Sequence, residues 1–221
     1  MWLKPVIKDS ISSTNSYIKE NNLPCGSVVI AKKQTAGRGR RGNSWVSDVD
    51  GNIYMSVVYK PDVPPEKIPL MSFAAGMAVR NSLFHFGIYC GLKWPNDVVS
   101  GGKKICGIMS ELWNGNCITG IGINLKQVDI PYATSAEELG FSLDFDAVVN
   151  LLLQNLEVEF THTEDLIERY TPHCVTLGKE ILIDGISRAT ATGIAPDGGL
   201  ITTIGTVSCG DVSVRGIYGY I

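Results

Sequence analysis

Gln34-Thr35-Ala36-Gly37-Arg38-Gly39-Arg40-Arg41-Gly42 separates two apolar runs, residues 28–31 and Ile53–Tyr59, whose composition is typical of β-strands. Glycine permits close backbone approach, and arginine offers a planar fork for phosphate or carboxylate. Two rigid strands would therefore present a mobile cationic loop that suits an anion. A solvated basic turn is the alternative interpretation of such a run.

Two common phosphate-binding motifs do not fit this loop. A P-loop requires Lys-Ser or Lys-Thr after its last glycine, whereas Gly42 is followed by Asn43-Ser44-Trp45. A dinucleotide-binding loop requires an acidic residue further along a βαβ unit, and none stands at that spacing.

Bulk composition predicts an ordinary folded protein. The 221 residues are 44% hydrophobic and 19% charged, with a formal net charge of -3. This charge argues against a general nucleic-acid binder, which needs a wide basic surface. The first residues lack the apolar core of a signal peptide, and no run is long enough to span a membrane. We therefore expect a cytoplasmic protein without a membrane partner.

Cysteine and histidine spacing gives no indication of a metal site. The six cysteines form no C-x-x-C pair, so buried reduced thiols are expected at positions 25, 90, 106, 117, 174 and 209. The three histidines are scattered and receive no function.

Hydrophobic periodicity predicts an α+β fold with a mixed sheet packed against helices. Candidate caps at residues 9–15 precede a short helix, and Leu70, Phe73, Ala74, Met77 and Phe84 mark a helix between Pro69 and Gly87 that packs one face inward. Further helices are expected over residues 145–160 and 163–170. Further strands are expected over residues 89–94, 104–111 and 117–125, joined by glycine-containing turns.

The last part of the chain has a different texture. Short β segments over residues 180–184, 188–194, 200–204 and 212–216 predict a small β-barrel. We place the boundary near Val175, which gives a catalytic domain over 1–175 and a barrel domain over 176–221.

Three further segments combine polar side chains with strand ends. Lys93-Trp94-Pro95-Asn96-Asp97 ends an apolar strand, Gly107 interrupts the run from Lys104 to Glu111, and Asn124 follows Gly120-Ile121-Gly122-Ile123. Each alone could be a simple turn or a gap for a close backbone approach.

The sequence resembles biotin protein ligases in four motifs that occur in the same order. They are the Gly/Arg loop of residues 34–42 with the Trp that follows it, Lys-Trp-Pro-Asn-Asp, Lys-x-x-Gly-Ile and Gly-Ile-Gly-Ile-Asn. Ser13-Thr14-Asn15 resembles the opening motif of that family. The resemblance implies a class II synthetase-like biotin–lipoate ligase fold with an SH3-like C-terminal barrel. Since few residues precede Ser13, we expect a short form without an N-terminal DNA-binding domain and without repressor activity.

The activity implied by this resemblance has two steps. Biotin and ATP, with Mg²⁺, give biotinyl-5′-AMP and pyrophosphate, and biotin then passes to a lysine of a biotin carboxyl carrier domain. Positioned cations are needed because the reacting carboxylate and polyphosphate repel each other. The family often dimerises through a sheet edge, so a homodimer is also possible.

The resemblance also implies site residues. The catalytic candidates are Arg40, Lys93, Asp97 and Lys104, with Asp97 linked to Mg²⁺ or orienting the attacking amine. The candidates for biotin binding are Ser13, Thr14, Asn15, Gln34, Arg38, Gly39, Arg40, Lys104 and Gly107. Those for ATP binding are Arg38, Arg40, Trp45, Asn96, Lys104 and Asn124.

The chain departs from the family pattern at Asn43, where a cation is common, and we expect a modest effect on loop ordering. Lipoate attachment is the alternative enzymatic function. A nucleic-acid-binding module and a non-catalytic biotin-binding protein are the alternatives from other classes.

Overall fold

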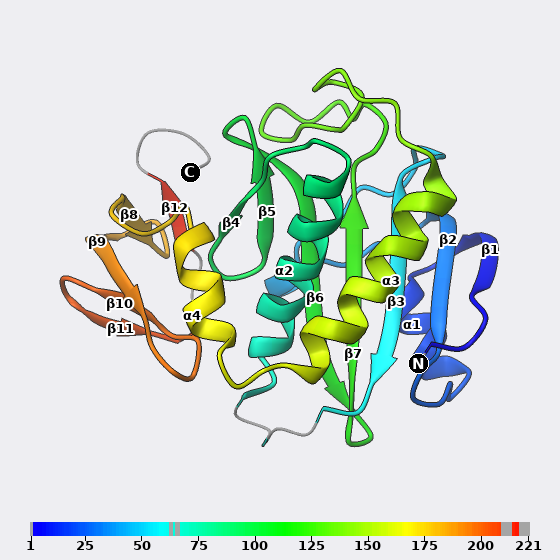
Figure 1. Ribbon diagram of the computed structural model, residues 1–221, viewed down its shortest axis with the longest axis horizontal. Helices are drawn as coiled ribbons and strands as arrows, with labels where there is room; N and C mark the ends of the chain where they lie inside the picture. Colours follow the sequence, from blue (N-terminus) through cyan, green and yellow to red (C-terminus); the bar gives the residue numbers. More distant parts are fainter. Residues whose placement is uncertain (1, 62–63, 65–66, 209–213, 217–221) are drawn as a thin grey trace.

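A seven-stranded sheet positions most of these motifs. The computed structural model describes residues 2–61, 64, 67–208 and 214–216. The sheet has the strand order β1-β2-β3-β7-β6-β5-β4 (Figure 1). Its strands are β1 Val6–Ile11, β2 Val28–Gln34, β3 Ile53–Tyr59, β4 Gly91–Lys93, β5 Asp97–Ser100, β6 Lys103–Trp113 and β7 Asn116–Ile123.

The sheet is mixed, as predicted. β1 pairs with β2 in parallel, and all other neighbours are antiparallel. Two strands were missed. β1 contains Asp9 and Ser10, which were wrongly taken for helix caps because this edge strand is only partly buried and lacks a strict apolar alternation. β5 lies between two segments that were expected to be joined directly.

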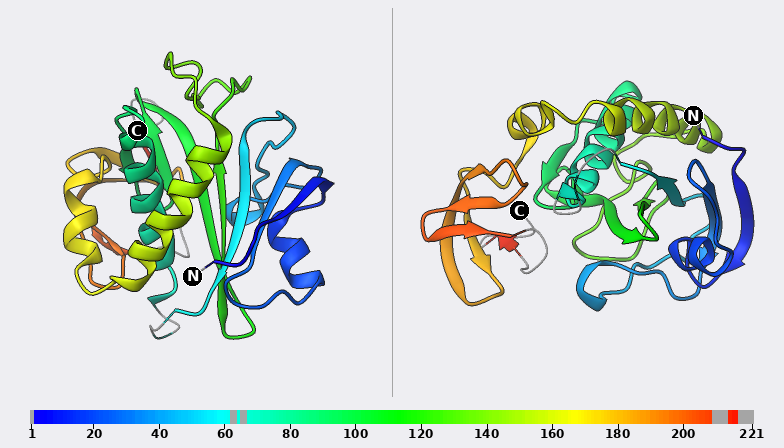
Figure 2. Two further views of the ribbon diagram at one scale, coloured as in Figure 1. Left: turned by 45° about the vertical axis from the view of Figure 1, so that its right-hand side comes forward. Right: turned by 90° about the horizontal axis from the view of Figure 1, so that it is seen from below.

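Helices cover both faces of the sheet. α2 Leu70–His85 and α3 Phe145–Thr161 pack together over one face, and α1 Thr14–Glu20 contacts β2, β3 and β7 from the other (Figures 1 and 2). α4 Leu166–Tyr170 and the short 3₁₀ turn η3 Thr171–His173 follow α3. Asp144 caps α3 by accepting a hydrogen bond from the Ala147 amide at 2.7 Å.

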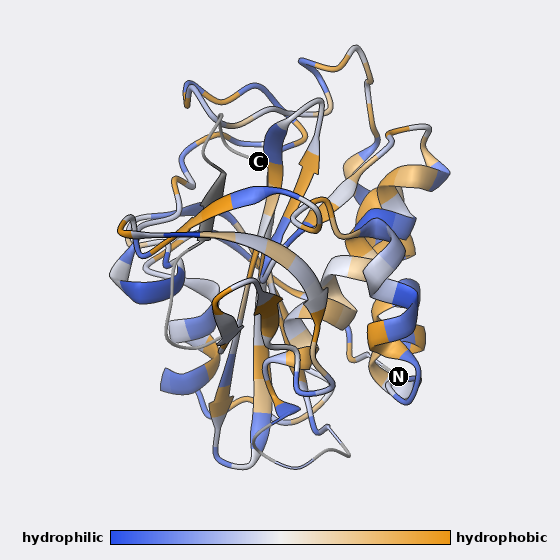
Figure 3. Cartoon of the chain, turned by 90° about the vertical axis from the view of Figure 1, so that its left-hand side faces the viewer, coloured by the Kyte–Doolittle hydropathy of each residue, from blue (hydrophilic) through white to orange (hydrophobic). Residues whose placement is uncertain are grey.

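The α2 helix is buried around most of its circumference because it lies between the sheet and α3. Leu70, Phe73, Ala74 and Met77 are core residues as predicted. Phe84 is not, since its side chain is 49% exposed and Leu83 takes the inward position of that turn. Figure 3 shows the hydrophobic colouring on the central strands and the adjacent helices.

A second, five-stranded antiparallel sheet follows, with the order β11-β10-β9-β8-β12. Its strands are β8 Glu180–Ile183, β9 Ser187–Ile194, β10 Leu200–Thr202, β11 Gly205–Val207 and β12 Val214–Gly216. The predicted strand over 200–204 ends at Thr202 as β10, and β11, which follows the next turn, was not predicted. Positions 212–213 of the last predicted strand lie outside the described residues. This sheet is consistent with the small C-terminal domain expected from the sequence.

The two sheets share one hydrophobic core, which includes Leu92 and Trp94 of the first part and Ile181, Ala191 and Leu200 of the second. Trp94 joins them directly, because its Nε1 donates to the Gly198 carbonyl at 2.9 Å and its amide donates to Thr176 Oγ1 at 2.9 Å. The second sheet lies beside the β4 edge of the first (Figures 1 and 2).

The described cysteines are free thiols. Cys106, Cys117 and Cys174 are buried as predicted, and burial raises the pKa of the partly buried Cys90 to about 12. Cys25 is exposed, contrary to prediction, and Cys209 lies outside the described residues. None of the helices that the structure describes is long and apolar enough to cross a membrane.

Candidate active site

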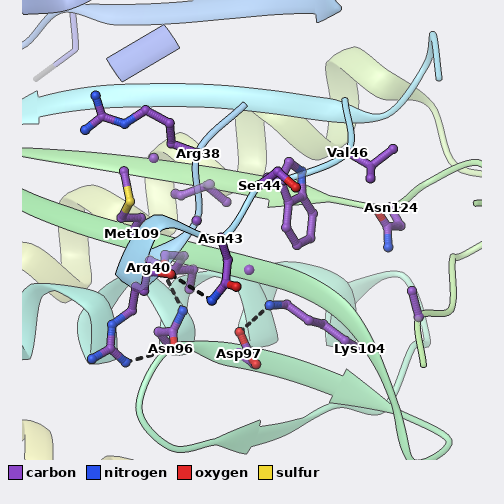
Figure 4. A pocket seen from close by; sticks show the side chains of 18 of the residues that line it. Arg38, Arg40, Asn43, Ser44, Val46, Asn96, Asp97, Lys104, Met109 and Asn124 are labelled. Atoms are coloured by element: carbon purple, nitrogen blue, oxygen red, sulfur yellow. Dashed lines mark hydrogen bonds and ion pairs between the residues drawn. The ribbon is translucent and has the colours of Figure 1, made fainter. Parts of the chain in front are cut away.

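A cavity of about 670 Å³ lies between β6, β7 and the Gly/Arg loop. Every residue that the sequence predicted for catalysis, biotin or ATP borders this one cavity. Segments from residue 13 to residue 124 therefore converge on one place. Figure 4 shows Arg38 and Arg40 on one side of it, and Lys104 and Asn124 on the other.

Glycines form the floor of the cavity. Gly107 of β6 pairs with Gly122 of β7, and Gly120 lies on the same face two residues before Gly122. A Cβ atom on Gly107 would lie 2.7 Å from Cζ3 of Trp45, and one on Gly122 would collide with the same indole. The absence of side chains thus lets the Trp45 ring lie directly on the strands. Gly107 was predicted to border the biotin tail, and here the indole of Trp45 covers it.

Lys104 and Asp97 form an ion pair beside this indole. Lys104 Nζ lies 2.6 Å from Asp97 Oδ1, and the two side chains are 17% and 13% exposed. The same ammonium lies 5.1 Å from the centre of the Trp45 ring, within the range of a cation–π contact. Asp97 begins β5 directly after the turn that contains the cis Trp94–Pro95 peptide. Lys93 is buried and lies opposite Asp97 in the backbone register of the β4–β5 hairpin.

Arg40 reaches the turn of this hairpin. Its Nη1 donates to Asn96 Oδ1 at 3.2 Å, and Asn96 Nδ2 donates to the Ile108 carbonyl at 2.8 Å. The Gly/Arg loop is thereby fastened to β6 through the predicted ATP-binding residue Asn96. The guanidinium lies at the cavity wall, where it can meet an anion.

Asn43, the departure from the family pattern, supports the backbone of the loop. Its Nδ2 donates to the Arg40 carbonyl at 2.9 Å, and its carbonyl accepts from the Gly39 amide at 2.7 Å. These bonds close the turn η1 Arg40–Gly42, in which Arg41 adopts a left-handed conformation with φ 56°. Arg41 Nη1 lies 2.6 Å from Asp184 Oδ1 in the turn between β8 and β9, so the second sheet contacts the loop.

Thr14, Asn15 and Gln34 form a polar wall of the same cavity. The Thr14 amide donates to Gln34 Oε1 at 2.8 Å, and Gln34 Nε2 donates to Ser47 Oγ at 2.9 Å. Ser13, Thr14 and Asn15 are each less than 5% exposed at the start of α1. Buried donors and acceptors that converge on a cavity suit a small polar ring.

The Asn124 side chain forms a hydrogen bond that holds a neighbouring loop. Its Nδ2 donates to the Thr134 carbonyl at 3.0 Å, which holds the segment around Tyr132 and Ala133 against the cavity. A parallel bridge between Lys104 and Ala133 fixes the same segment. Burial raises the pKa of Cys106, next to Gly107, well above the ordinary thiol value, so this thiol stays protonated at neutral pH.

Sequence analysis did not predict several residues that line the cavity or bond its lining residues, notably Ser56, Glu111 and Tyr132. The alternation Gly120-Ile121-Gly122 could have indicated a glycine floor, because residues two apart share a strand face. No sequence signal links Ser56 to Asn15. Within the described ranges, no cluster of three or more His, Cys, Asp or Glu side chains could hold a metal ion.

The chain is similar to known proteins over most of its length. Residues 5–127 match the model of the biotin/lipoate A/B protein ligase family. The chain is 35% identical over 209 residues to the biotin--[acetyl-CoA-carboxylase] ligase of Mycobacterium tuberculosis, which covers 85% of this chain and 78% of that protein.

A second relative is longer. The chain is 37% identical over 147 residues to the bifunctional ligase/repressor BirA of Bacillus spizizenii, a match that covers 62% of this chain and 45% of that protein. The match thus spans less than half the length of this relative.

The fold has a close structural counterpart. The biotin protein ligase from Aquifex aeolicus, in complex with biotin and ATP, superposes with a TM-score of 0.86 at 28% identity, covering 97% of this chain and 100% of that one. Together with the match over residues 5–127, this identifies the chain as a member of the biotin/lipoate A/B protein ligase family.

Proposed function

We propose that the chain is an ATP-dependent biotin–protein ligase. The observation that carries this proposal is one cavity that joins a buried polar wall around Thr14, Asn15 and Gln34 to the cations Arg40 and Lys104. Relatives named as biotin ligases, and a similar structure described with biotin and ATP, support the same activity. The cavity is large enough for a small vitamin and a nucleotide.

In the first step, a carboxylate oxygen of biotin attacks the α-phosphorus of ATP. The bond between the α-phosphorus and its bridging oxygen breaks, and pyrophosphate leaves. Lys104 would neutralise charge between the carboxylate and the α-phosphate, and Arg40 would hold the phosphate from the loop side. Trp45 would lie beside the adenine, and Asn124 would add a polar contact.

In the second step, the amine of a carrier lysine attacks the acyl carbon of the adenylate and releases AMP. The lysine must first lose a proton, and Asp97, which lines the cavity, would accept it or orient the amine. The ion pair with Lys104 would hold this carboxylate in place at the cavity wall. Lys93 would support the same turn from beneath.

We propose that Mg²⁺ enters as part of the substrate, bound to the phosphates of ATP. Magnesium keeps several water ligands and is commonly held by one or two carboxylates plus substrate phosphates. Among the described residues that line the cavity, Asp97 is the only one with a carboxylate, and the described residues form no cluster of His, Cys, Asp or Glu for a protein-built site.

The remaining expectations stay predictions. They are a biotin carboxyl carrier domain as partner, a cytoplasmic location, the absence of DNA binding, a homodimer through a sheet edge and a domain boundary near Val175.

A direct assay tests the proposal. The purified chain is incubated with ATP, Mg²⁺, a biotin carboxyl carrier domain and either biotin or lipoate, and the carrier is weighed by mass spectrometry. We expect one added biotinyl group and no lipoyl group. Modification with lipoate alone would overturn the substrate assignment, and an unmodified carrier without biotin-dependent pyrophosphate release would overturn the ligase proposal.

A further inference from the structure

Glu111 of β6 joins three segments that meet at the biotin side of the cavity. Its Oε1 accepts from Asn15 Nδ2 at 2.8 Å. Its Oε2 lies 2.6 Å from Lys19 Nζ and 3.3 Å from Arg38 Nη2. The start of α1, the Gly/Arg loop and β6 therefore depend on one carboxylate, whose side chain is 22% exposed.

The bond to Asn15 fixes the orientation of a buried amide. Asn15 is 3% exposed, and its Oδ1 lies 2.5 Å from Ser56 Oγ. A Cβ atom on Gly120 would lie 2.6 Å from this Oδ1, so the amide rests on the glycine floor. The Ser56 hydroxyl can donate to the oxygen, and the Glu111 carboxylate can only accept from the nitrogen. These two partners hold the amide in a single orientation.

That orientation affects the wall expected to bind biotin. Asn15 follows Thr14 in the first turn of α1, and Ser56 Oγ lies 2.6 Å from Thr14 Oγ1. Thr14 in turn bonds Gln34. A rotated Asn15 amide would present its NH₂ group to Ser56 and alter the hydrogen bonding of Thr14 and Gln34.

The pair with Arg38 is the weaker part of this arrangement. The Arg38 side chain is 46% exposed, and exposed ion pairs contribute little free energy. The pair matters more for the position of the Arg38 side chain, which extends away from Lys104 (Figure 4). Glu111 therefore holds the first arginine of the loop on the biotin side, while Arg40 is held at Asn96.

We propose that Glu111 is a positioning residue for biotin binding, acting through Asn15 and, to a smaller extent, through Arg38. This inference rests on the proposed ligase function. Glu111 does not itself take part in the reaction of biotin with ATP. Its loss should raise the dissociation constant of biotin and leave the turnover at saturating biotin nearly unchanged.

The test compares Glu111→Ala and Glu111→Gln with a matched control, Glu159→Gln. Glu159 is a buried carboxylate that also contacts an asparagine amide and an arginine, Asn81 and Arg169, but it lies on α3 away from the cavity. Biotin affinity is measured by calorimetry without ATP. The turnover number, the KM for ATP and the thermal midpoint are measured for each variant.

We expect Glu111→Ala to weaken biotin binding about tenfold, because a buried amide loses its acceptor. Glu111→Gln keeps an acceptor for Asn15 and should weaken binding only about threefold. The turnover number and the KM for ATP should change less than about twofold. Glu159→Gln should lower the thermal midpoint without weakening biotin binding.

Unchanged biotin affinity in folded Glu111→Ala, with the wild type binding biotin, would overturn this inference and leave the ligase proposal intact. If Glu111→Ala does not fold, Glu111→Gln decides: the inference fails if its biotin affinity equals that of the wild type. A wild-type chain that neither binds biotin nor forms the adenylate would overturn both proposals. Equal weakening by Glu159→Gln would reduce the effect to lost stability and overturn the inference.

Discussion

The two faces of β6 and β7 carry different kinds of residues. On one face, Ile108 pairs with Ile121, and the side chain of Ile108 reaches Gly76 of α2 in the core. On the other face, Gly107 pairs with Gly122 beneath the cavity. Adjacent residues of one strand thus serve stability and ligand contact separately, since side chains alternate between faces.

Because core residues and cavity residues lie on opposite faces of the same strand, we expect that activity and stability can be changed independently in it. A change on the cavity face should alter ligand handling with little effect on unfolding. A change on the core face should do the reverse. Three substitutions test this division, and a fourth tests the contact between the second sheet and the Gly/Arg loop.

Lys104→Ala should have the largest effect on the reaction. Loss of the ammonium at the carboxylate and α-phosphate should slow adenylate formation about 1,000-fold, as for other groups that stabilise developing charge. Single-turnover release of pyrophosphate measures this rate. Lys103→Ala is the matched control, because Lys103 pairs with Glu138 at the surface. An adenylation rate near that of the wild type would show that Lys104 is not part of the reaction.

Ile108→Ala should act on stability. Its side chain is 2% exposed in the core, and removing it should lower the free energy of unfolding by about 3 kcal/mol. Chemical denaturation measures this value. Biotin affinity of the folded fraction should remain within about twofold of the wild type. A large loss of affinity would break the proposed division between the faces.

Gly122→Ala should act on the nucleotide side. The added methyl group would displace the Trp45 indole from the floor, and we expect the KM for ATP to rise about tenfold. Initial-rate kinetics at saturating biotin measure this change. Gly193→Ala in β9 is the control, because its Cβ would lie at an ordinary 3.5 Å from Ile201. Equal effects of the two variants would contradict a specific role for the floor.

Asp184→Asn should have the smallest effect. It removes an exposed ion pair between the second sheet and Arg41, with side chains 38% and 44% exposed, so adenylate dissociation should accelerate no more than about threefold. The dissociation rate should approach that of the wild type at high salt, because salt also screens the wild-type pair. A tenfold acceleration would show that the second sheet controls the loop more strongly.

Much of the fold follows from the sequence because core positions have regular spacing. The helix at Leu70–His85 was predicted from helical apolar spacing between Pro69 and Gly87, and the strand at Ile53–Tyr59 was predicted from a continuous apolar run. β1 was missed because an edge strand buries little, and Phe84 was misplaced because periodicity does not show which neighbour covers a helix.

The candidate site was predicted for a different reason. Its residues come from motifs of a known family, and the structure gathers them around one cavity. Glu111 and Ser56 could not be predicted, because their partners Arg38 and Asn15 are distant in the sequence. The roles of the cavity residues toward ligands stay predictions.

The position of Trp94 has a consequence for any attempt to shorten the protein. Its backbone amide needs Thr176, its ring nitrogen needs Gly198, and the amide of Val175 donates to the carbonyl of Leu92. A cut at the expected boundary would remove the hydrogen-bond acceptors of the Trp94 indole and of its backbone amide, next to the β4–β5 hairpin. Thr176 and Gly198 therefore support the turn that carries Asn96 and Asp97, and we expect a fragment ending at residue 175 to bind nucleotide poorly even where it remains folded.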